Sequence, residues 1–303
     1  MWFKNLRIYR LAGALELMEQ EVEDGLATQS FRPCGQMELD SAGFVPPLGQ
    51  DDGPLSHSVN GCRLFCMRRA ERLLPAAVVN EVVAEKVAHI EDTEGYPVRR
   101  QERNRIKDAV FHELLPQAFV RSRLVWAYLD ESTGLLLVDA ASANRAEEFL
   151  VVLREALGSL PVYPLTVAQS PANIMSAWLR GDDRIAGLSL GEECELRDPE
   201  GAEGVVRCRG VDLSDPEVQA HLEHGRYAVR LALDWEDRLS FVLGDDFVIR
   251  RLRFGDRLLE ERERDEADDE ASRRDADFAL MALELRTFLP RLIEAFGGIA
   301  ENP

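Results

Sequence analysis

The sequence is poor in lysine and has no long apolar run. Of its 36 basic residues only Lys4, Lys86 and Lys107 are lysines, in a chain of 303 residues. None of the three follows a glycine, which excludes a Walker A phosphate-binding loop. No apolar stretch approaches the ~20 residues that cross a membrane. Arg7 and Arg10 interrupt the first ten residues, so we expect no signal peptide and no membrane partner.

Cysteine and histidine are also scarce, which argues against a metal centre. The chain has five cysteines, none of them in Cys-x-x-Cys spacing, and five histidines. His221 and His224 are three residues apart on an expected helix, with no third ligand of matching spacing. We therefore expect inert thiols in a reducing cytoplasm, no metal and no cofactor.

A catalytic serine is the main enzymatic alternative. Gly187-Leu188-Ser189-Leu190-Gly191 matches the G-x-S-x-G nucleophile elbow, which requires a strand-to-helix turn. Leu188 and Leu190 alternate as in a strand, and the downstream histidines follow too closely for a hydrolase fold. We expect no catalytic residues and no enzyme. A hydrolase centred on Ser189 remains a distant alternative.

Charge is unevenly distributed along the chain. The formal net charge is −19, with 36 basic and 55 acidic residues, so the protein is not basic all over. Residues 99–123 nevertheless hold seven basic and three acidic residues, and residues 259–277 hold ten acidic residues and four arginines. Local potential decides nucleic-acid binding, so an acidic chain can carry a basic surface. The acidic run predicts a linker or a solvated helix face.

Hydrophobic periodicity predicts helices and strands in the first 180 residues. Pro75 is expected to open a helix with Val79 and Val83 on one face, which Gly95 and Pro97 end. The Gly- and Pro-rich segment 32–61 is expected to be irregular. Further strands are expected at 2–11, 62–67, 124–130, 134–140 and 161–165, with helices at 15–26, 98–115, 142–158, 171–180 and 277–296.

From residue 185 onward short strands predominate, near 186–196, 204–211, 227–236, 238–243 and 247–254. One helix interrupts them, where Ser214-Asp215-Pro216-Glu217 has the pattern of a capping box. Arginines alternate with apolar residues along these strands, at positions 207, 209, 230, 251 and 253. This alternation predicts an antiparallel sheet with a basic exposed face.

Eight short strings occur together from residue 2 to the C-terminal helix, in the order of one known family. They are Trp2-Phe3-Lys4-Asn5-Leu6, Phe31-x-Pro33-Cys34-Gly35, Gly43-Phe44-Val45-Pro46-Pro47, Leu114-Leu115-Pro116-x-Ala118-Phe119, Val138-Asp139-x-Ala141-Ser142-Ala143, Leu157-Gly158-Ser159-Leu160-Pro161-Val162, Leu231-Ala232-Leu233-Asp234-Trp235 and Asp275-Ala276-Asp277-Phe278. Over nearly its whole length the chain resembles the RdgC family of recombination-associated proteins. Gln117 and Gly210 stand where family members often carry a basic residue.

The resemblance implies an α+β chain of several subdomains, with antiparallel sheets and a helical projection, that forms a ring-shaped homodimer. It implies a central α+β domain at 1–75 and 120–180, a helical tip at 76–119, and a β-rich base domain at 181–303 with a C-terminal helix. The residues expected at the dimer interface are Phe119, Leu115 and Pro116. The residues expected to bind DNA are Arg99, Arg100, Arg103, Lys107, Arg209, Arg226 and Arg230.

The function implied by the resemblance is non-enzymatic. The dimer would encircle duplex DNA of any sequence, associate with the nucleoid in the cytoplasm, and restrain RecA-type recombinase indirectly by occupying DNA. The alternative suggested by the acidic run at 259–277 is an acidic protein-interaction module that acts on recombination or replication proteins without DNA.

Overall fold

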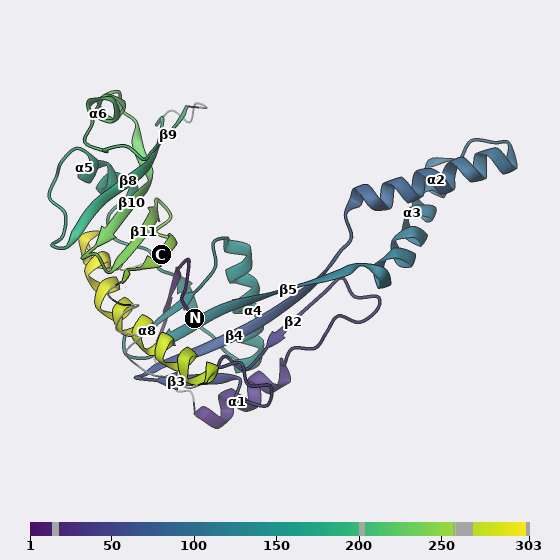
Figure 1. The fold of residues 1–303 in the computed structure, drawn as a ribbon, viewed down its shortest axis with the longest axis horizontal. Coiled ribbons are helices and arrows are strands. Elements are labelled where there is room, and N and C mark those ends of the chain that lie inside the picture. The colour runs from purple at the N-terminus through teal and green to yellow at the C-terminus, as the bar shows by residue number, and fades with distance from the viewer. Residues whose placement is uncertain (14–17, 200–203, 257, 259–268, 301–303) are drawn as a thin grey trace.

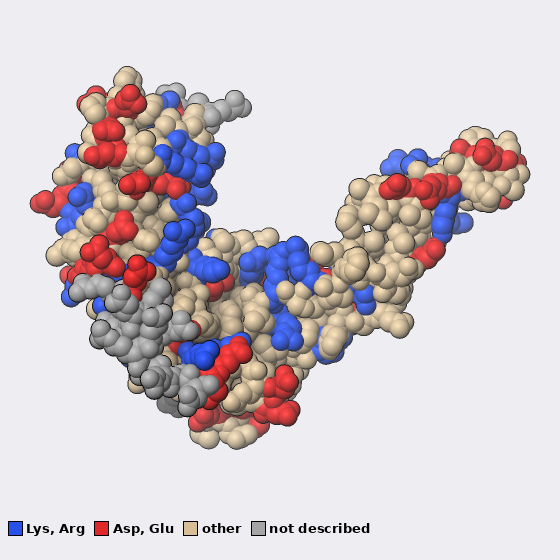
Figure 2. Space-filling view, viewed as in Figure 1, with Lys and Arg blue, Asp and Glu red and all other residues tan. Residues whose placement is uncertain are grey.

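The protein is built from two antiparallel β-sheets and a helical arm, joined in a U-shaped molecule (Figure 1). The computed structural model describes residues 1–303 except 14–17, 200–203, 257, 259–268 and 301–303. The larger central sheet lies at the bottom of the U. The smaller base sheet and the arm rise from its two ends, and the space-filling view in Figure 2 shows an open hollow between them. The α+β class with antiparallel sheets predicted from the sequence is confirmed.

The central sheet has the strand order β2-β4-β5-β6-β1-β7, and β3 also pairs with β4. Its backbone is the long pair β4–β5, in which Cys62 lies opposite Asp130 and Leu73 opposite Phe119. The strands are β1 (Arg7–Leu11), β2 (Asp40–Phe44), β3 (Ser56–Val59), β4 (Cys62–Leu73), β5 (Phe119–Asp130), β6 (Leu135–Val138) and β7 (Val162–Pro164). The prediction that residues 32–61 are irregular is therefore wrong in part, because β2 and β3 lie within this segment.

The arm is inserted between β4 and β5. It consists of α2 (Ala76–Glu94) and α3 (Arg100–Leu114), followed by the short 3-10 turn η1 (Leu115–Gln117). Gly95 ends α2 in the left-handed conformation, with φ of 74°, which glycine adopts without steric cost. Val79, Val83 and Val110 form a small apolar core between the two helices, separate from the two larger cores.

Two helices cover one face of the central sheet. These are α1 (Glu19–Thr28) and α4 (Ala143–Leu157). Val22 and Leu26 of α1 pack with Phe149 and Leu153 of α4 in one apolar cluster that includes the sheet residues Phe44 and Met67. The opposite face contributes to a second cluster, shared with the base sheet.

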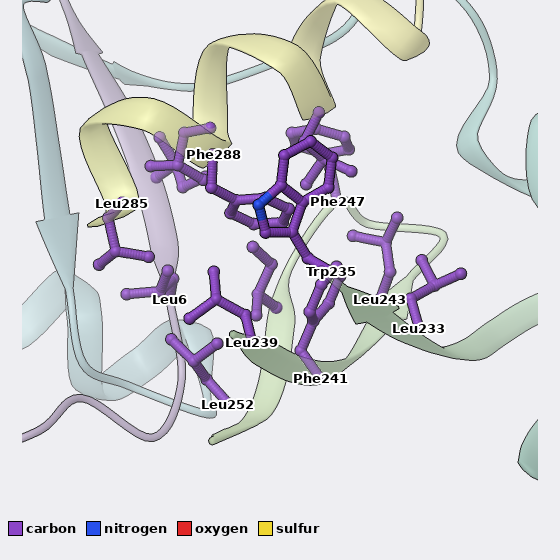
Figure 3. Packing of buried hydrophobic residues seen from close by; sticks show 14 of the residues in the cluster. Leu6, Leu233, Trp235, Leu239, Phe241, Leu243, Phe247, Leu252, Leu285 and Phe288 are labelled. Atoms are coloured by element: carbon purple, nitrogen blue, oxygen red, sulfur yellow. The ribbon is translucent and has the colours of Figure 1, made fainter. Parts of the chain in front are cut away.

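The base sheet has the order β12-β11-β10-β8-β9. One face packs against helices, with Trp235 and Phe241 in contact with Phe288 of the C-terminal helix (Figure 3). The other face carries no helix in Figure 1 and is turned toward the hollow. The elements are α5 (Pro171–Leu179), β8 (Leu188–Arg197), β9 (Val205–Arg209), α6 (Pro216–Glu223), β10 (Tyr227–Trp235), β11 (Leu239–Gly244), β12 (Ile249–Phe254) and α8 (Glu270–Ala295).

The N-terminal segment joins the two sheets. Leu6 exchanges backbone hydrogen bonds with Ile249 of β12, at 2.8 and 3.1 Å, immediately before it enters the central sheet as β1. Arg286 of α8 adds a second connection, because its guanidinium donates to both carboxylate oxygens of Asp130 at the end of β5, at 2.8 and 3.0 Å. The sheets are thus held together by backbone pairing and by a half-buried ion pair.

Two local expectations need correction. Asp215, not Ser214, is the N-cap of α6, and its side chain makes no capping hydrogen bond. Ser214 instead donates its backbone N–H and its hydroxyl to Asp212. Part of the acidic run lies outside the described residues, at 259–268, and the remainder begins α8 at Glu270.

Candidate nucleic-acid interface

A cluster of arginines occupies the exposed face of the base sheet. Because side chains alternate along a strand, the apolar residues of β9, β10 and β12 point to the core while the arginines between them point to solvent. The exposed fractions of their side chains include 70% for Arg209 and 49% for Arg230. We call this cluster the base-sheet arginines: Arg197, Arg207, Arg209, Arg230, Arg251 and Arg253.

Two glutamates hold these arginines in place. Glu195 is buried in the centre of the cluster and receives Arg207 at 3.0 Å and Arg230 at 3.6 Å. Glu193 receives Arg251 at 2.8 Å. Burial alone would raise the pKa of Glu195, but the surrounding guanidinium groups outweigh burial and hold that pKa below its ordinary value. Five of the six arginines therefore share two carboxylates, and Arg253 pairs with no described residue, which leaves the cluster net positive.

The basic residues face the hollow of the U. Figure 2 shows Lys and Arg side chains gathered on the side of the base lobe that borders the hollow, and again at its floor near α4 and β5. The acidic side chains in this view lie mostly on the outer surface of the base lobe, on the lower surface and along the arm. An acidic chain therefore presents a basic inner surface.

The floor of the hollow carries a second, more neutral set of arginines on β4 and β5. Arg121 and Arg123 pair with Glu71, and Arg69 pairs with Asp40 at 2.7 Å. Arg69 also pairs with Glu148 of α4. Each of these cations already has an acidic partner, so the floor contributes less net charge than the base sheet.

The arm carries the remaining expected DNA-binding cations. Arg100, Arg103 and Lys107 lie on α3 and are exposed, and Arg99 is the exposed N-cap residue of that helix. None of the four forms an ion pair with another described residue. Their guanidinium and ammonium groups are therefore open to solvent.

Arg226 differs from the other expected residues. It is half-buried, and its guanidinium lies 2.6 Å from Nδ1 of His221. It therefore turns toward α6, which removes much of its capacity to contact a phosphate. The sequence offered no sign of this contact, since both residues look solvent-exposed from their spacing.

The three expected interface residues lie at the root of the arm but differ in exposure. Phe119 is 86% exposed and Pro116 is also exposed, whereas Leu115 is 1% exposed and packs inside its own chain. Leu115 therefore cannot offer its side chain to a partner. Arg72 fixes this turn, since it donates to the carbonyl oxygens of Pro116 and Ala118, each at 3.3 Å, and of Gly35 at 3.2 Å.

The G-x-S-x-G string does not form a nucleophile elbow. Ser189 is the second residue of β8 and pairs with Asp234 of β10, and its hydroxyl makes one long contact of 3.5 Å with the Asp234 carbonyl. Within the described ranges no group of three or more His, Cys, Asp or Glu side chains is placed to hold a metal ion. No helix of the described residues is long and apolar enough to cross a membrane.

The residues that the family resemblance led us to expect at the DNA interface did not include four of the base-sheet arginines, at positions 197, 207, 251 and 253. Three of them were marked by the alternation of arginine with apolar residues in β9 and β12. That signal predicted the basic face of the sheet, but it did not indicate which arginines share a carboxylate.

Comparisons with known proteins agree with the resemblance. The family model described as "RdgC: Putative exonuclease, RdgC" matches residues 1–299. The chain is 43% identical over 299 residues to the "Recombination-associated protein RdgC" of Pseudomonas putida, and 44% identical over 299 residues to that of Pseudomonas aeruginosa. It is 40% identical over 298 residues to that of Aeromonas hydrophila, and each alignment covers 98% of both chains. The chain belongs to the RdgC family of recombination-associated proteins.

Proposed function

We propose that this protein binds duplex DNA of any sequence inside a ring made by two copies, and restrains a RecA-type recombinase by occupying the DNA. The observation that carries the proposal is the set of base-sheet arginines turned toward the hollow in a chain of net charge −19. Duplex DNA attracts such a surface through its phosphates, independently of base sequence. The printed names of the relatives, which associate them with recombination, also support it.

The arrangement fits phosphate recognition better than base recognition. Guanidinium groups donate two parallel hydrogen bonds to a phosphate, and the base-sheet arginines are spread over four strands of one face. Within the described residues, no helix lies on this face to enter a groove and read base edges. We therefore expect the protein to bind DNA electrostatically and to slide along it.

The root of the arm supports the proposal of a second copy. Phe119 is 86% exposed, Val120 is 50% exposed, and Leu73, which lies opposite Phe119, is 40% exposed. Large aromatic side chains at the centre of an interface often act as anchors in a partner's pocket. In the proposed ring this contact and one between the bases would close the hollow around DNA.

Fluorescence anisotropy of a labelled duplex of about 30 base pairs, titrated with protein across a salt series, tests DNA binding. We expect binding at low salt, with log K falling linearly with log salt and independent of DNA sequence. Absence of binding at low salt would remove the proposal. Sedimentation of the free protein tests the dimer, and a circular duplex retained at high salt better than a linear one would indicate encirclement.

We further propose that the protein acts without cutting DNA. The family description names an exonuclease, so the direct test is incubation of end-labelled duplex and single-stranded DNA with Mg²⁺ or Mn²⁺. Shortened products that persist with highly purified protein would refute a purely binding role. Recombinase filament assembly on DNA, with this protein added before or after the recombinase, tests the restraint.

The alternative, a protein-interaction module, has one structural observation in its favour. A hollow of about 700 Å³ lies between β2 and α4, where Asp40, Glu147, Glu148 and Arg69 surround the apolar residues Met67 and Val151. Arg69 pairs with Asp40 and Glu148, but the three carboxylates outnumber this one cation, and a net acidic rim suits a basic partner. Capture of recombinase by this protein in nuclease-treated, high-salt extract would favour this function.

A further inference from the structure

A local hollow of about 500 Å³, separate from the open space of the U, lies on the exposed face of the base sheet, beside the base-sheet arginines. It lies over β10 and β11, with the edge of β8 on one side and Arg251 and Arg253 of β12 on the other. Regular antiparallel strands produce an even surface, so a depression of this size needs a local cause.

Irregular pairing on both sides makes the depression. On β8 the register passes from Cys194 opposite Leu231 to Leu190 opposite Leu233, so that three residues oppose Ala232 alone. On β12, Arg253 lies opposite Ser240 and Arg250 lies opposite Val242. Two residues of β12 therefore lie between these pairs where β11 has only one. Bulges of this kind bend a strand and redirect side chains, and they are enriched beside functional sites.

The second bulge holds Arg251 in an unfavourable backbone conformation. Arg251 has φ of 52°, in the left-handed region that residues with a Cβ rarely occupy. The bulge directs its guanidinium across β11 and β10 to Glu193 in the opposite bulge, at 2.8 Å. Strain of this kind persists where the surrounding structure requires it, and it points to a function for the arginine.

Small residues form the floor of the hollow. Ala232 and Gly191 lie against one another, and a Cβ added to Gly191 would come within 2.9 Å of the Ala232 Cβ. Val242 continues this surface on the next strand. The floor therefore consists of small apolar groups, against which the face of a planar ring can lie.

The two ends of the hollow carry opposite charge. Asp234, Ser240 and Arg253 lie in one row across β10, β11 and β12, so the acid and the arginine are about 10 Å apart at the usual strand spacing. Neither Asp234 nor Arg253 forms an ion pair with another described residue. Burial, with Asp237 and Glu192 nearby, raises the pKa of Asp234. A ligand with an N–H donor at one end and an anion at the other would satisfy both.

We propose that this hollow binds a single nucleotide, with its phosphate at Arg251 and Arg253, its base on the floor, and an amino group of the base donating to Asp234. Adenine and cytosine carry such an amino group at the base edge, whereas thymine carries an oxygen acceptor there. The nucleotide has two possible sources, a free nucleotide or an unstacked nucleotide of bound DNA. The second source rests on the proposed function, whereas the first does not.

The first arm of the test uses free dAMP, dCMP and dTMP, titrated into the full-length protein by calorimetry, with inorganic phosphate for comparison. We expect dAMP and dCMP to bind about tenfold more tightly than dTMP, because dTMP has no amino group and its one ring donor, N3–H, lies between two carbonyl oxygens that repel the carboxylate. Asp234→Asn should remove most of this difference. Ala232→Leu fills the floor and should abolish binding, and its thermal unfolding shows whether the fold is kept.

The second arm uses duplexes that contain one unpaired dA or one unpaired dT, with the intact duplex as control. We expect tighter binding of the dA duplex than of the dT duplex, and loss of that preference in Ala232→Leu while intact-duplex binding is retained. A preference in the first arm assigns the site to free nucleotides, and a preference in the second arm alone assigns it to DNA. Equal binding of adenine and thymine forms in both arms, or an unchanged preference in folded Ala232→Leu, overturns the proposal. Failure of the intact duplex to bind would count against the proposed function and leave the first arm decisive.

Discussion

Replacement of Arg230 by alanine tests how the base-sheet arginines act. Arg230 is 49% exposed and lies 3.6 Å from Glu195, a longer separation than the 3.0 Å between Arg207 and the same carboxylate. Glu195 keeps Arg197 and Arg207 in the variant. The substitution therefore removes one available cation without leaving a buried carboxylate unpartnered, and we expect the fold to remain stable.

The salt dependence of binding gives the magnitude. Each phosphate contact adds about 0.9 to the slope of log K against log salt. Raising the salt from ~50 to ~200 mM weakens binding by a certain factor. In a protein with one contact fewer, that factor is about 3.5-fold smaller. In the proposed ring each of the two protomers loses one contact, so the slope should change by about 1.8. The factor by which the same salt increase weakens binding should then be about 12-fold smaller than in the unmodified protein.

The assay is anisotropy of a labelled duplex at several salt concentrations, with two unrelated DNA sequences. Arg180→Ala is the matched control, because Arg180 is an exposed arginine at the end of α5, the helix that packs against β10 from the core side. We expect the control to have the slope of the unmodified protein. An unchanged slope in Arg230→Ala, an equal change in Arg180→Ala, or a loss that depends on DNA sequence would refute the electrostatic mechanism.

Three further predictions concern association and stability. Phe119→Ser should weaken self-association in sedimentation, because it removes a side chain that is 86% exposed, while Tyr163→Ser, at a side chain 52% exposed, should not; an unchanged dimer would contradict the interface. Arg286→Met should lower the free energy of unfolding in urea by about 3–5 kcal/mol, because it leaves the buried Asp130 carboxylate without its cation; a loss below about 1 kcal/mol would show that the ion pair is not needed. The pKa of Glu195 is below its ordinary value of 4.5, so its contribution to stability is present above that value and is lost as the pH falls through the lowered pKa. Thermal unfolding followed from about pH 6 to about pH 3 should therefore be less pH-dependent in Glu195→Gln, and identical profiles would contradict the role of this carboxylate.

The elements predicted best from sequence are those whose periodicity is carried by their own residues. The first arm helix was predicted because Val79 and Val83 recur at helical spacing, and both residues lie in the small core of the arm. The base strands were predicted because apolar residues alternate with arginine, as the burial of β10 and β12 confirms. In both cases the local pattern and the tertiary burial agree.

The elements that were missed depend on a neighbouring strand. β2 has the sequence Asp-Ser-Ala-Gly-Phe, a poor strand former on its own, and it is a strand because each residue pairs with β4. β5 begins at Phe119 rather than at the expected residue 124, since its polar start pairs with the second half of β4. Pairing partners that lie far away in the sequence leave no local signal.

The candidate site shows the same limit. Arg209 and Arg230 lie on the exposed sheet face, as the alternation of residues suggests. The arginine bulge at Arg251 could not be foreseen, because a one-residue insertion is defined only relative to the partner strand. The contact of Arg226 with His221 and the burial of Leu115 are likewise products of tertiary packing.

The pairing of the N-terminal segment with β12 has a consequence for the order of folding. The residues around Phe3 are synthesised long before their partners, as in the 3.3 Å contact of the Phe3 N–H with Sδ of Met281, which spans 278 residues. These contacts cannot form until β12 and α8 have been synthesised, whereas the arm and the β4–β5 pair can fold earlier. Closing so long a loop is slow. We therefore expect the junction between the sheets to be the last part of the molecule to form and the part most exposed to misassembly during synthesis.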